Sequence, residues 1–578
     1  MRTFVADLET TTNPNDCRVW AYAICEVGNK ENIEIGNNLD DFMKWCANKK
    51  ENFKVLFHNL KFDSQSILVW LLQNEYRHVF DQSERKTKTF TTIINDKGLY
   101  YQIEVIFQRG GKTVNKVVFE DSKKLVDMSV KEIAKTFNMP YQKLEIDYKK
   151  DRPIGYEITE EEKEYIKHDV LIVATAVEFF YQNNLTKMTI GSCAMEDYIS
   201  ILGKKNFKRF FPVLPQDRDM RQSYRGGFTY LNPKFEGKEI KNGIVLDYNS
   251  VYPSIMYDEI LPYGKPIFFT GEYQEDEFYP LYIQMFRCQF ELKKGMIPTV
   301  QIRFGSDYSA NEYLTTSNGE IKTLCMTNYD LELFKEHYEI YNIEYKSGWK
   351  FKGVKGLFKN YVEKWYKVKV DSKVNDNPGM YEISKRMLNA LYGKFGTLPK
   401  FVNKKPSLNK NNIIEFNSKD NFVVYKDGVY VPMASFITSI CRNRIITAAQ
   451  HVMNEYNSGR SEIEFIYADT DSLHLKTDEF EIPTYFEYDD LKLGKFKVEA
   501  IFRRAKYLKQ KCYIQERYNK KENDYNLKVT VAGMPEGCYQ YVNFKNFKIG
   551  ATYKGSLKSQ NVPGGVVLSE VDFTIQKV

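Results

Sequence analysis

The sequence predicts a multidomain protein of mixed α/β and α+β class, and three observations support this prediction. The chain has 578 residues, and at about 150 residues per domain this length suggests roughly four structural units. Hydrophobic residues make up 43% of the chain and charged residues 28%, which is typical of folded domains and not of disordered ones. Residues 1–188 alternate strand-like and helix-like patterns, as α/β units do.

The alternation in this first unit is clearest in four segments. Residues 4–12 and 54–63 have the apolar character of strands, the second running into a loop, and residues 64–76 read as a helix. Residues 158–182 form a long amphipathic pattern, which Thr159 opens and which carries acidic residues in its first turn. We therefore expect a long helix to cover this unit.

The remainder of the chain mixes short β-like segments with long helices and begins a second unit near residue 190. The expected segments are a strand within 241–253, short strands within 259–356, helices at 358–370 and 381–395 around a turn at 372–379, a hairpin-like excursion at 397–424, a helix at 434–456, a β-hairpin at 464–477 and a short, irregular final stretch of about 45 residues.

Composition excludes several classes of protein. No apolar run approaches the ~18 residues that a membrane-spanning helix needs, and acidic residues follow the N-terminus too soon for a secretory signal. The nine cysteines form no CxxC pair and the six histidines no HxxxH pair, which disfavours a zinc cluster or a disulfide scaffold and fits a reducing cytoplasm. A net charge of +7 permits a polyanionic partner. Aromatic residues make up 15% of the chain and suit stacking on nucleic-acid bases, although aromatics also fill ordinary cores.

One group of acidic residues is expected to meet within the first α/β unit. Asp7 and Glu9 are two positions apart on a predicted strand, so both side chains point to one face. Asp63 follows a second strand, and Tyr165 and Asp169 are four positions apart, hence on one face of a helix. Each pair alone equally describes a solvated surface. Together, four carboxylates and a tyrosine suit two-metal phosphodiester hydrolysis, in which carboxylates hold the ions and the hydroxyl orients water.

A second acidic group lies downstream. Asp247 ends an apolar strand, and Asp469 and Asp471 lie in the turn of the predicted hairpin. A D-T-D turn is common, but acidic residues buried between apolar strands require a partner or a metal ion. Asp247 and Asp471, from separate strands, suit the two ions of a nucleotidyl transfer reaction.

A helical stripe lies between the two parts of this second group. Lys385, Asn389 and Tyr392 are spaced four and three apart, which places them on one face of a helix. A lysine for phosphates with a tyrosine further along suits a nucleotide-binding helix. An ordinary amphipathic helix, with the tyrosine packed and the lysine solvated, explains the same spacing.

Taken in order, these motifs resemble the family B DNA polymerases, and in particular the protein-primed subgroup of the phi-twenty-nine type. The resemblance covers nearly the whole chain and implies a ribonuclease-H-like 3′–5′ exonuclease domain, followed by a polymerase domain of palm, fingers and thumb with two subgroup-specific insertions. The motifs are DLET (7–10), NLKFD (59–63), YIKHD (165–169), YRGG (224–227), DYNSVYP (247–253), KRMLNALYG (385–393), TSICR (438–442), YADTDS (467–472) and KCY (511–513).

The resemblance implies a role for each motif residue. The implied exonuclease residues are the metal carboxylates Asp7, Glu9, Asp63 and Asp169, the water-orienting Tyr165, the assisting Lys143, and Thr10, His58, Asn59, Phe62, Ser122 and Tyr148 for single-stranded 3′ ends. The implied polymerase residues are the metal ligands Asp247 and Asp471, the supporting Asp469, the steric gate Tyr252, the nucleotide-binding Lys369, Lys385, Asn389 and Tyr392, the primer-passing Tyr224, Arg225, Gly226 and Gly227, and the primer-template residues Thr438, Arg442, Lys511 and Tyr513.

DYNSVYP and KRMLNALYG resemble the family's motifs A and B, and their long separation assigns the subgroup, because it exceeds what a palm-to-fingers crossover requires. The extra segments resemble the two family insertions, of which the first contacts the priming protein and the second encloses the template and supports processivity and strand displacement; an inert elaboration is the alternative. The expected domains are residues 1–188 (exonuclease), 189–258 (palm, first part), 259–356 (insertion 1), 357–396 (fingers), 397–424 (insertion 2), 425–532 (palm, second part) and 533–578 (thumb).

The chain departs from the family pattern at several positions. Ala390 stands where motif B usually has serine, and Tyr381 where a second lysine is common, which leaves Lys369 or Lys367 to contact phosphate. The fingers turn is longer than usual. The other departures are Cys441 for a small residue in TSICR, Ser66 for an aromatic and Lys123 for leucine in the exonuclease.

The predicted function is that of a DNA-directed DNA polymerase with a 3′–5′ proofreading exonuclease, which is protein-primed, processive and strand-displacing and replicates a linear phage-type genome. The resemblance implies two Mg²⁺ ions per active site, with Mn²⁺ as an alternative. The expected partners are primer-template and single-stranded DNA, dNTPs and a terminal protein, with a single-stranded-DNA-binding protein as a further candidate and no membrane. We expect a monomer in the cytoplasm of a host bacterium.

Three alternatives remain open. A conventional nucleic-acid-primed family B polymerase would use the same catalytic residues without a priming protein. A single-stranded-DNA coating protein would explain the tyrosines and lysines but not the acidic groups, because carboxylates repel phosphates unless metal ions intervene. A self-contained exonuclease would leave the residues after about 190 unexplained.

Overall fold

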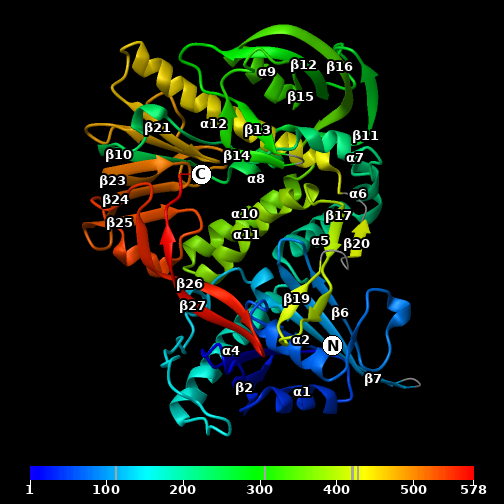
Figure 1. Ribbon diagram of the computed structural model, residues 1–578. Coiled ribbons are helices and arrows are strands. Elements are labelled where there is room, and N and C mark those ends of the chain that lie inside the picture. Colours follow the sequence, from blue (N-terminus) through cyan, green and yellow to red (C-terminus); the bar gives the residue numbers. More distant parts are fainter. Residues whose placement is uncertain (111–112, 305–306, 418–421, 426–428, 578) are drawn as a thin grey trace.

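The computed structural model contains two large sheets joined by helices and by a long C-terminal hairpin (Figure 1). It describes residues 1–110, 113–304, 307–417, 422–425 and 429–577. In the view of Figure 1 the N-terminal sheet, in blue, lies below, and the second sheet, in green and orange, lies above it. Among the described residues, no helix is long and apolar enough to cross a membrane.

The N-terminal sheet has eight strands in the order β3-β2-β1-β4-β8-β7-β6-β5, with β1, β4 and β8 parallel to one another. The strands are β1 (Arg2–Thr10), β2 (Val19–Glu26), β3 (Asn29–Gly36), β4 (Phe53–Phe57), β5 (Arg77–His78), β6 (Thr89–Ile94), β7 (Tyr100–Gly110) and β8 (Thr113–Asp121). The associated helices are α1 (Leu39–Asn48), α2 (Asp63–Gln73), α3 (Val130–Thr136) and α4 (Glu160–Gln182).

Helix α4 confirms the long helix predicted at 158–182, and the reason for its start is visible in the structure. The Thr159 side chain accepts a hydrogen bond from the Glu162 N–H, while the Glu162 carboxylate accepts one from the Thr159 N–H. This capping box satisfies otherwise unpaired N–H groups of the first turn. Arg152, itself buried, pairs with the same carboxylate at 3.0 Å.

The second sheet, called here the central sheet, has seven strands in the order β25-β24-β23-β10-β22-β21-β9. Its middle strand, β10, pairs with β22 and β23, which come more than 200 residues later in the chain. The hairpin predicted at 464–477 is confirmed as β21 and β22. The strands are β9 (Thr229–Leu231), β10 (Glu239–Tyr248), β21 (Glu464–Asp469), β22 (Ser472–Lys476), β23 (Phe496–Lys509), β24 (Cys512–Asn519) and β25 (Asp524–Val531).

Helices flank this sheet, and a third sheet lies above it in Figure 1. Helix α12 contains the helix predicted at 434–456, and most of its residues are buried. The helices are α5 (Ile190–Leu202), α6 (Lys204–Phe210), α7 (Asp217–Met220), α8 (Val251–Asp258), α9 (Asn328–His337), α10 (Lys359–Val374), α11 (Pro378–Phe395) and α12 (Val431–Asn457); short 3₁₀ turns lie at Gln82–Glu84, Ser122–Lys124, Arg221–Ser223, Pro233–Phe235 and Glu536–Tyr541.

The third sheet, called here the insertion sheet, has the order β11-β16-β12-β15 and falls within 259–356, where short strands were predicted. Its strands are longer than the short strands that were predicted; β16 alone has 18 residues. The strands are β11 (Ile260–Thr270), β12 (Leu281–Leu292), β15 (Lys322–Thr327) and β16 (Tyr338–Lys355), with β13 (Val300–Phe304) and β14 (Asp307–Leu314) as a separate pair.

The excursion predicted at 397–424 contains two small two-stranded sheets, β17-β20 and β18-β19. Residues 418–421 of this prediction lie outside the described residues. The strands are β17 (Lys400–Asn403), β18 (Pro406–Leu408), β19 (Ile414–Phe416) and β20 (Phe422–Tyr425).

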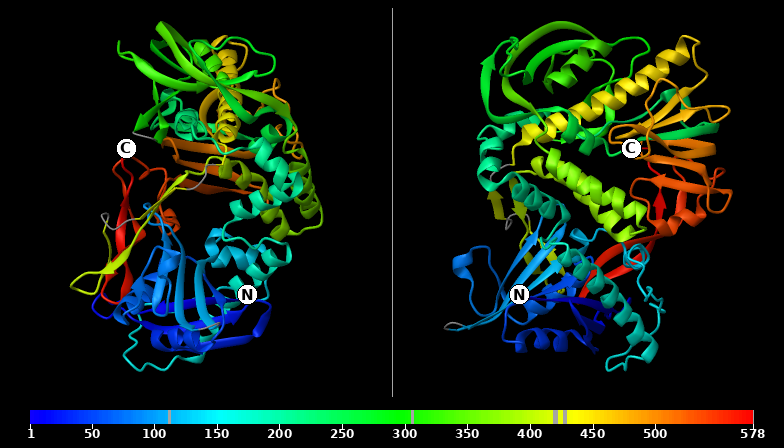
Figure 2. Two further views of the ribbon diagram at one scale, coloured as in Figure 1. Left: turned by 90° about the vertical axis from the view of Figure 1, so that its right-hand side faces the viewer. Right: turned by 180° about the vertical axis from the view of Figure 1, so that it is seen from behind.

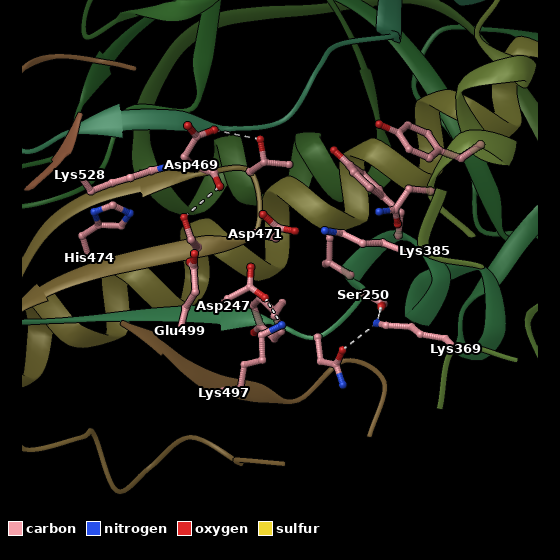
Figure 3. A pocket seen from close by; sticks show the side chains of 18 of the residues that line it. Asp247, Ser250, Lys369, Lys385, Asp469, Asp471, His474, Lys497, Glu499 and Lys528 are labelled. Carbon is pink, nitrogen blue, oxygen red and sulfur yellow. Dashed lines mark hydrogen bonds and ion pairs between the residues drawn. The ribbon is translucent and has the colours of Figure 1, made fainter. Parts of the chain in front are cut away.

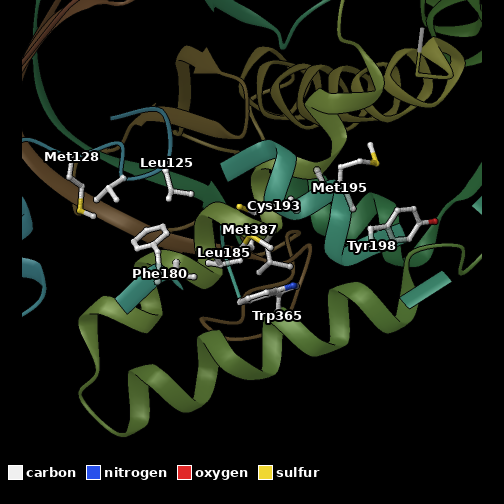
Figure 4. Close-up of a cluster of buried hydrophobic side chains, with 14 of the residues drawn as sticks. Leu125, Met128, Phe180, Leu185, Cys193, Met195, Tyr198, Trp365 and Met387 are labelled. Atoms are coloured by element: carbon white, nitrogen blue, oxygen red, sulfur yellow. The ribbon is translucent and has the colours of Figure 1, made fainter. Parts of the chain in front are cut away.

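One continuous apolar core joins the N-terminal unit to the helix pair α10 and α11 (Figure 4). Phe180 of α4, Met195 of α5 and Trp365 of α10 belong to it, and the Trp365 indole N–H donates to Asp197 at 2.8 Å. Because this core is shared, the helix pair and the N-terminal unit are packed together as one body. Other labelled members are Leu125, Met128, Leu185, Cys193, Tyr198 and Met387.

Two predictions of local structure were wrong. The turn predicted at 372–379 spans only residues 375–377, because Asn377 caps α11 by accepting a hydrogen bond from the Met380 N–H and Pro378 begins that helix. The predicted irregular C-terminus forms a long hairpin, β26 (Thr552–Val562) and β27 (Gly565–Thr574). Many exposed polar residues hide its strand character in the sequence.

The C-terminal hairpin, red in Figures 1 and 2, extends from the central sheet to the N-terminal unit. At its tip, a Cβ added at Gly564 would lie 2.1 Å from the Cys17 carbonyl oxygen, and one at Gly565 would lie 2.8 Å from the Ser66 Oγ. Only glycine permits so close an approach, and the φ of +91° at Gly564 favours it as well. The Asn561 amide also donates to the Ile414 carbonyl of β19 at 3.4 Å.

Candidate active sites

The first acidic group meets where β1, α2 and α4 adjoin. One carboxylate oxygen each from Asp7, Glu9 and Asp169 lie within 4.8 Å of one another. Asp63, the first residue of α2, accepts a hydrogen bond from the Leu8 N–H at 3.2 Å and stands beside this trio. We call the four carboxylates the N-terminal carboxylate site.

The chemistry of this site fits a divalent cation. Burial raises the pKa of Asp7 to about 7, and the neighbouring Asp169 charge adds to the shift. Burial likewise raises the pKa values of Glu9 and Asp63. Among the described residues, the buried Asp169 Oδ1 has no hydrogen-bond partner. Clustered oxygen ligands with an unpartnered buried oxygen are what a hard cation such as Mg²⁺ would stabilise.

A lysine and two tyrosines adjoin this site. Lys143 forms an ion pair with Asp169, and its Nζ lies 3.3 Å from the Tyr165 hydroxyl. That hydroxyl is 2.8 Å from the hydroxyl of Tyr148. Burial and the Glu9 charge raise the pKa of Tyr165, so its hydroxyl stays protonated at neutral pH and can orient a polar atom. Lys143, Tyr148, Tyr165 and Asp169 therefore form one connected network.

A cavity of about 810 Å³ opens beside the N-terminal carboxylate site. Of the residues expected to hold single-stranded DNA, Thr10, Phe62 and Tyr148 line it. Its opposite wall comes from the C-terminal hairpin, which sequence reasoning did not assign to this site. No local signal could have done so, because the two walls are about 500 residues apart in the chain. The hairpin residues are Leu557, Val566, Val567, Leu568 and Glu570.

Three predicted single-strand residues do not line this cavity. His58 has both ring nitrogens in contacts, 3.1 Å from the Ser122 Oγ and 2.7 Å from the Met128 carbonyl oxygen. The Asn59 N–H donates to the Asp121 carboxylate at 3.0 Å. His58 and Ser122 are thus hydrogen-bonded to each other, and the backbone of Asn59 is fixed by Asp121.

The second acidic group meets in the central sheet (Figure 3). Asp247, near the end of β10, is opposite Ser472 of β22, and the Tyr248 N–H donates to the Asp471 carbonyl at 2.8 Å. These pairings bring Asp247 and Asp471 together from two strands. We call Asp247, Asp469 and Asp471 the central carboxylate site.

Asp471 and Asp469 have different surroundings. Burial, with the charges of Asp247 and Asp469, raises the pKa of Asp471 to about 7. Asp469 accepts hydrogen bonds from the Tyr467 hydroxyl at 3.2 Å and the Thr470 hydroxyl at 3.1 Å, and its Oδ1 lies 3.6 Å from the Lys511 Nζ. Asp469 is thus held by several protein groups and Asp247 by one, Lys497 at 2.9 Å. The charges of Asp247 and Asp471 also repel each other, and a cation would neutralise this repulsion.

A cavity of about 630 Å³ lies over the central carboxylate site. The ring of Tyr252 stacks on that of Tyr392 at a centroid distance of 4.0 Å. The Lys369 Nζ donates to the Ser250 Oγ at 2.9 Å, and burial with the charges of Lys497 and Lys385 lowers the pKa of Lys369 to about 8. The predicted residues that line this cavity are Asp247, Tyr252, Lys369, Lys385, Asn389, Tyr392, Asp469, Asp471 and Tyr513.

Sequence reasoning missed several residues of this cavity. Lys497 and Glu499 are two apart on β23, and this spacing, which places both on one face of a strand, is a signal that could have found them. The other missed residues with charged or ionisable side chains are His474, Arg517 and Lys528.

The YRGG segment runs against the Asp469–Asp471 turn. A Cβ added at Gly227 would lie 2.9 Å from the Thr470 side chain, and the Thr470 N–H donates to the Phe228 carbonyl at 2.7 Å. Tyr224 packs against Gly396 at the end of α11, and Arg225 is buried with its guanidinium donating to the Cys325 carbonyl at 3.1 Å. This segment therefore joins the turn, α11 and the insertion sheet.

Thr438 and Arg442 of α12 are each only 2% exposed. The Thr438 hydroxyl donates to the Ala434 carbonyl of its own helix at 3.0 Å. Arg442 pairs with Asp330 of α9 at 2.6 Å and donates to the Arg225 and Gly226 carbonyls. In this structure neither side chain faces the central cavity, so any effect of theirs on DNA is exerted through the residues they hold.

The departures from the family pattern fall in different surroundings. Tyr381 lines the central cavity, and the Cys441 thiol donates to the Thr470 carbonyl at 3.5 Å, directly behind the turn. Ser66 lies under the tip of the C-terminal hairpin. The Lys123 N–H donates to Asp121, and nothing in the structure explains Ala390 or the side chain of Lys123.

Residues 46–154 and 145–485 match the family described as DNA polymerase type B, organellar and viral. The DNA polymerases of Bacillus phage Nf and Bacillus phage phi29 are 44% and 43% identical to this chain, each over 99% of both chains. That of Streptococcus phage Cp-1 is 32% identical over 99% of this chain and 98% of its own.

Solved structures agree with these sequence matches. The phi29 DNA polymerase complexed with primer-template DNA and incoming nucleotide substrates matches all of both chains with a TM-score of 0.92 at 42% identity. The same polymerase complexed with single-stranded DNA matches with a TM-score of 0.91. This likeness confirms the predicted fold class, a multidomain protein with an exonuclease and a polymerase domain. The chain therefore belongs to the type B DNA polymerases of the organellar and viral family, and within it resembles the phi29-type phage enzymes.

Proposed function

We propose that this DNA polymerase synthesises DNA at the central carboxylate site, degrades 3′ ends at the N-terminal carboxylate site and is primed by a terminal protein. The observation that carries the proposal is the presence of two separate carboxylate sites, each beside its own cavity. Two Mg²⁺ ions at each site, with Mn²⁺ able to substitute, would supply charge neutralisation and an activated oxygen nucleophile.

For synthesis, Asp247 and Asp471 would hold the ions, with Asp469 fixing the turn. Lys369 and Lys385, which line the same cavity, would orient the triphosphate. Tyr252, whose ring stacks on that of Tyr392, would collide with a ribose 2′-hydroxyl and so select deoxynucleotides. The helix residues Asn389 and Tyr392 would contact the nascent base pair, and Lys511 and Tyr513 the primer terminus.

For 3′ degradation, Asp7, Glu9, Asp63 and Asp169 would hold the ions. The protonated Tyr165 hydroxyl would orient the attacking water, and Lys143 would stabilise Asp169 and the charge that develops on the phosphate. Thr10, Phe62 and Tyr148 would contact the single-stranded end, with His58, Asn59 and Ser122 fixing the strand ends behind them.

The proposed domains follow the expected boundaries: residues 1–188 as exonuclease, 189–258 and 425–532 as palm, 357–396 as fingers and 533–578 as thumb. Residues 259–356 would contact the terminal protein, and 397–424 would enclose the template and support processivity and strand displacement. The contact of Asn561 with Ile414, between the C-terminal hairpin and this second insertion, supports an enclosing arrangement. The identity to phage polymerases supports action in the cytoplasm of a bacterial host.

Two single substitutions test the assignment of the two activities. Asp247→Ala should abolish primer extension and leave the degradation of single-stranded oligonucleotides, and Asp169→Ala should do the reverse. Both are measured on one labelled primer in Mg²⁺, with and without dNTPs. Loss of both activities from either change, in a protein that still folds, would refute the two-site assignment.

Priming and processivity need their own assays. With a singly primed single-stranded circle and excess trap DNA, products longer than one circuit would support intrinsic processivity and strand displacement. Transfer of a labelled nucleotide to a hydroxyl of a partner protein, in the absence of a DNA primer, would support protein priming. Short products and no transfer would identify a conventional nucleic-acid-primed enzyme.

A further inference from the structure

Lys497 is a cation of the central cavity that belongs to no sequence motif. Lys497 lies on β23 directly opposite Asp247 in the strand register, and its Nζ is 2.9 Å from the Asp247 Oδ2. Its side chain is 33% exposed, and the exposed part faces the cavity, which Lys497 lines. Figure 3 shows its ammonium group beside Asp247, near Lys369 and Lys385.

Four lysines line this cavity: Lys528 of β25, and three that act on one another's charges, Lys369 from α10, Lys385 from α11 and Lys497 from β23. Their charges repel one another, and the lowered pKa of Lys369 reflects this repulsion together with burial. Such a cluster is unfavourable unless an anion shares it, because partly buried like charges raise each other's free energy. Asp247 pairs with only one of the three ammonium groups.

We propose that Lys497 is a third phosphate-binding lysine of the nucleotide site, which is paired with Asp247 in the absence of substrate and binds the triphosphate when nucleotide enters. The inference rests on the proposed polymerase function. When the Asp247 carboxylate serves as a metal ligand, the ammonium group gives up that oxygen. The flexible lysine side chain can then turn to a phosphate oxygen in the same cavity.

The origin of Lys497 gives it a role distinct from that of the other two lysines. Lys369 and Lys385 lie on the helix pair, whereas Lys497 lies on the same sheet as the carboxylates, one strand from Asp247. Its contact with phosphate therefore does not depend on the position of the helix pair.

The test compares Lys497→Met with Lys495→Met. Lys495 is two residues away, but its side chain forms an ion pair with Glu487 and does not line the central cavity. Equilibrium binding of dNTP is measured by fluorescence on a complex of enzyme with a dideoxy-terminated primer-template, in Ca²⁺ so that no reaction follows. The Kd for dNTP should rise about 10-fold or more in Lys497→Met, as loss of a charge-assisted hydrogen bond predicts, and stay unchanged in Lys495→Met.

Two further measurements separate phosphate binding from other roles. Binding of dNMP, which lacks the two outer phosphates, should weaken less than that of dNTP, and Lys497→Arg should retain most of the dNTP affinity. Mn²⁺ binding to the metal-free protein, followed by electron paramagnetic resonance, should be unchanged or tighter in Lys497→Met, because a competing cation is gone. Thermal unfolding checks that each variant is folded.

The outcomes decide between this inference and the broader proposal. Equal dNTP affinity in Lys497→Met and the unsubstituted protein would overturn the role of Lys497 while leaving the polymerase assignment intact. Equal weakening of dNMP and dNTP binding would also overturn it, because the effect would not arise at the outer phosphates. Failure of the unsubstituted protein to bind dNTP or extend a primer would overturn the proposed function itself.

Discussion

The N-terminal and central carboxylate sites share one ligand chemistry but differ in the cations around it. In the first, three carboxylate oxygens lie within 4.8 Å with Lys143 as the adjoining lysine. In the second, the cavity over Asp247 and Asp471 is lined by five cationic side chains, Lys369, Lys385, Lys497, Arg517 and Lys528. A single phosphodiester brings one negative charge and a triphosphate brings several, so the larger number of cations at the central site matches its proposed triphosphate substrate.

The two sites also differ in how they are supported. The first is built from residues 7–169 on one sheet and its covering helix. The second draws on strands far apart in the chain, and Arg442 behind it is paired with Asp330 at the edge of the insertion sheet. The comparison teaches that long-range strand pairing assembles the carboxylates of the second site, whereas in the first site only a wall of the cavity, from the C-terminal hairpin, is distant in the chain.

The largest expected effect comes from removing a metal ligand of the central site alone. Asp471→Asn should lower the rate of primer extension by about 10³-fold or more, because the buried cluster loses the charge that holds a cation. Degradation of a single-stranded oligonucleotide should stay near the unsubstituted rate. Asp469→Asn is the matched control, and its rate of primer extension should fall less, since protein groups already hold that carboxylate. Equal falls in rate would show that Asp469 and Asp471 do not have different roles.

The support of the central site can be tested through Asp330. Asp330→Asn leaves Arg442 buried and uncompensated, which should cost about 3 kcal/mol of folding free energy in denaturant-induced unfolding. Burial by itself would raise the pKa of Asp330, but the charges of Arg442 and Arg225 hold this pKa below its usual value. The ionised Asp330 therefore adds its full share to the folding free energy above about pH 3.9, the pKa of this side chain in the unfolded chain. This stabilisation is lost as the pH falls through the lower pKa of the folded protein.

The difference between Asp330→Asn and the unsubstituted protein should accordingly narrow below about pH 4. A double variant, Asp330→Leu with Arg442→Met, replaces both charges by apolar groups and should recover much of the lost stability. If Asp330→Asn were as stable as the unsubstituted protein at neutral pH, the central site would not depend on the ion pair at the edge of the insertion sheet.

The N-terminal site is probed by a substitution that leaves its carboxylates in place. Tyr165→Phe removes the hydroxyl that adjoins Lys143 and Tyr148, and should reduce 3′ degradation about 10²-fold by losing the orientation of water. Primer extension should be unaffected, because the tyrosine lies in the other site. Measuring both rates on one preparation checks this, and an equal fall in extension would show that the sites are not independent.

The smallest effect concerns pH and Mg²⁺. Carboxylates whose pKa is raised in the fold favour folding when protonated, so the metal-free protein should lose stability as the pH rises toward 7 and above. Added Mg²⁺ should therefore raise the unfolding midpoint more at pH 8 than at pH 6, by a few degrees in scanning fluorimetry. Asp7→Asn should reduce the rise in midpoint that Mg²⁺ causes. A larger rise at pH 6 than at pH 8 would contradict the predicted pH dependence.

Local patterns predicted the parts of each site that lie on one element. The period of two places Asp7 and Glu9 on one face of β1, and spacings of four and three place Lys385, Asn389 and Tyr392 in one cavity. They could not predict contacts that depend on which strands become neighbours. Lys497 joins the site because β23 pairs with β10; its spacing of two from Glu499 indicates a shared strand face but not which strand becomes the neighbour.

The same limit applies to the C-terminal hairpin. Val566 and Leu568 line the exonuclease cavity only because the chain folds back over its own beginning, and their polar neighbours conceal the strands. The resemblance assigns His58 to single-stranded DNA, and the structure adds that one of its ring nitrogens lies 2.7 Å from the Met128 carbonyl oxygen. A motif predicts which residues lie near one another, but it does not predict which of their atoms remain free of protein contacts and can bind DNA.

The split central sheet has a consequence for how the protein is made. A ribosome that adds about 5–20 residues per second delivers β10 roughly 10–40 s before β22 and β23, the strands that flank it. During this interval both edges of an apolar strand lack their final partners, a condition that favours aggregation. The N-terminal sheet can close meanwhile, because its last strand ends at Asp121. A chaperone bound near residue 245 during this interval would therefore protect the polymerase half of the nascent chain far more than the exonuclease half.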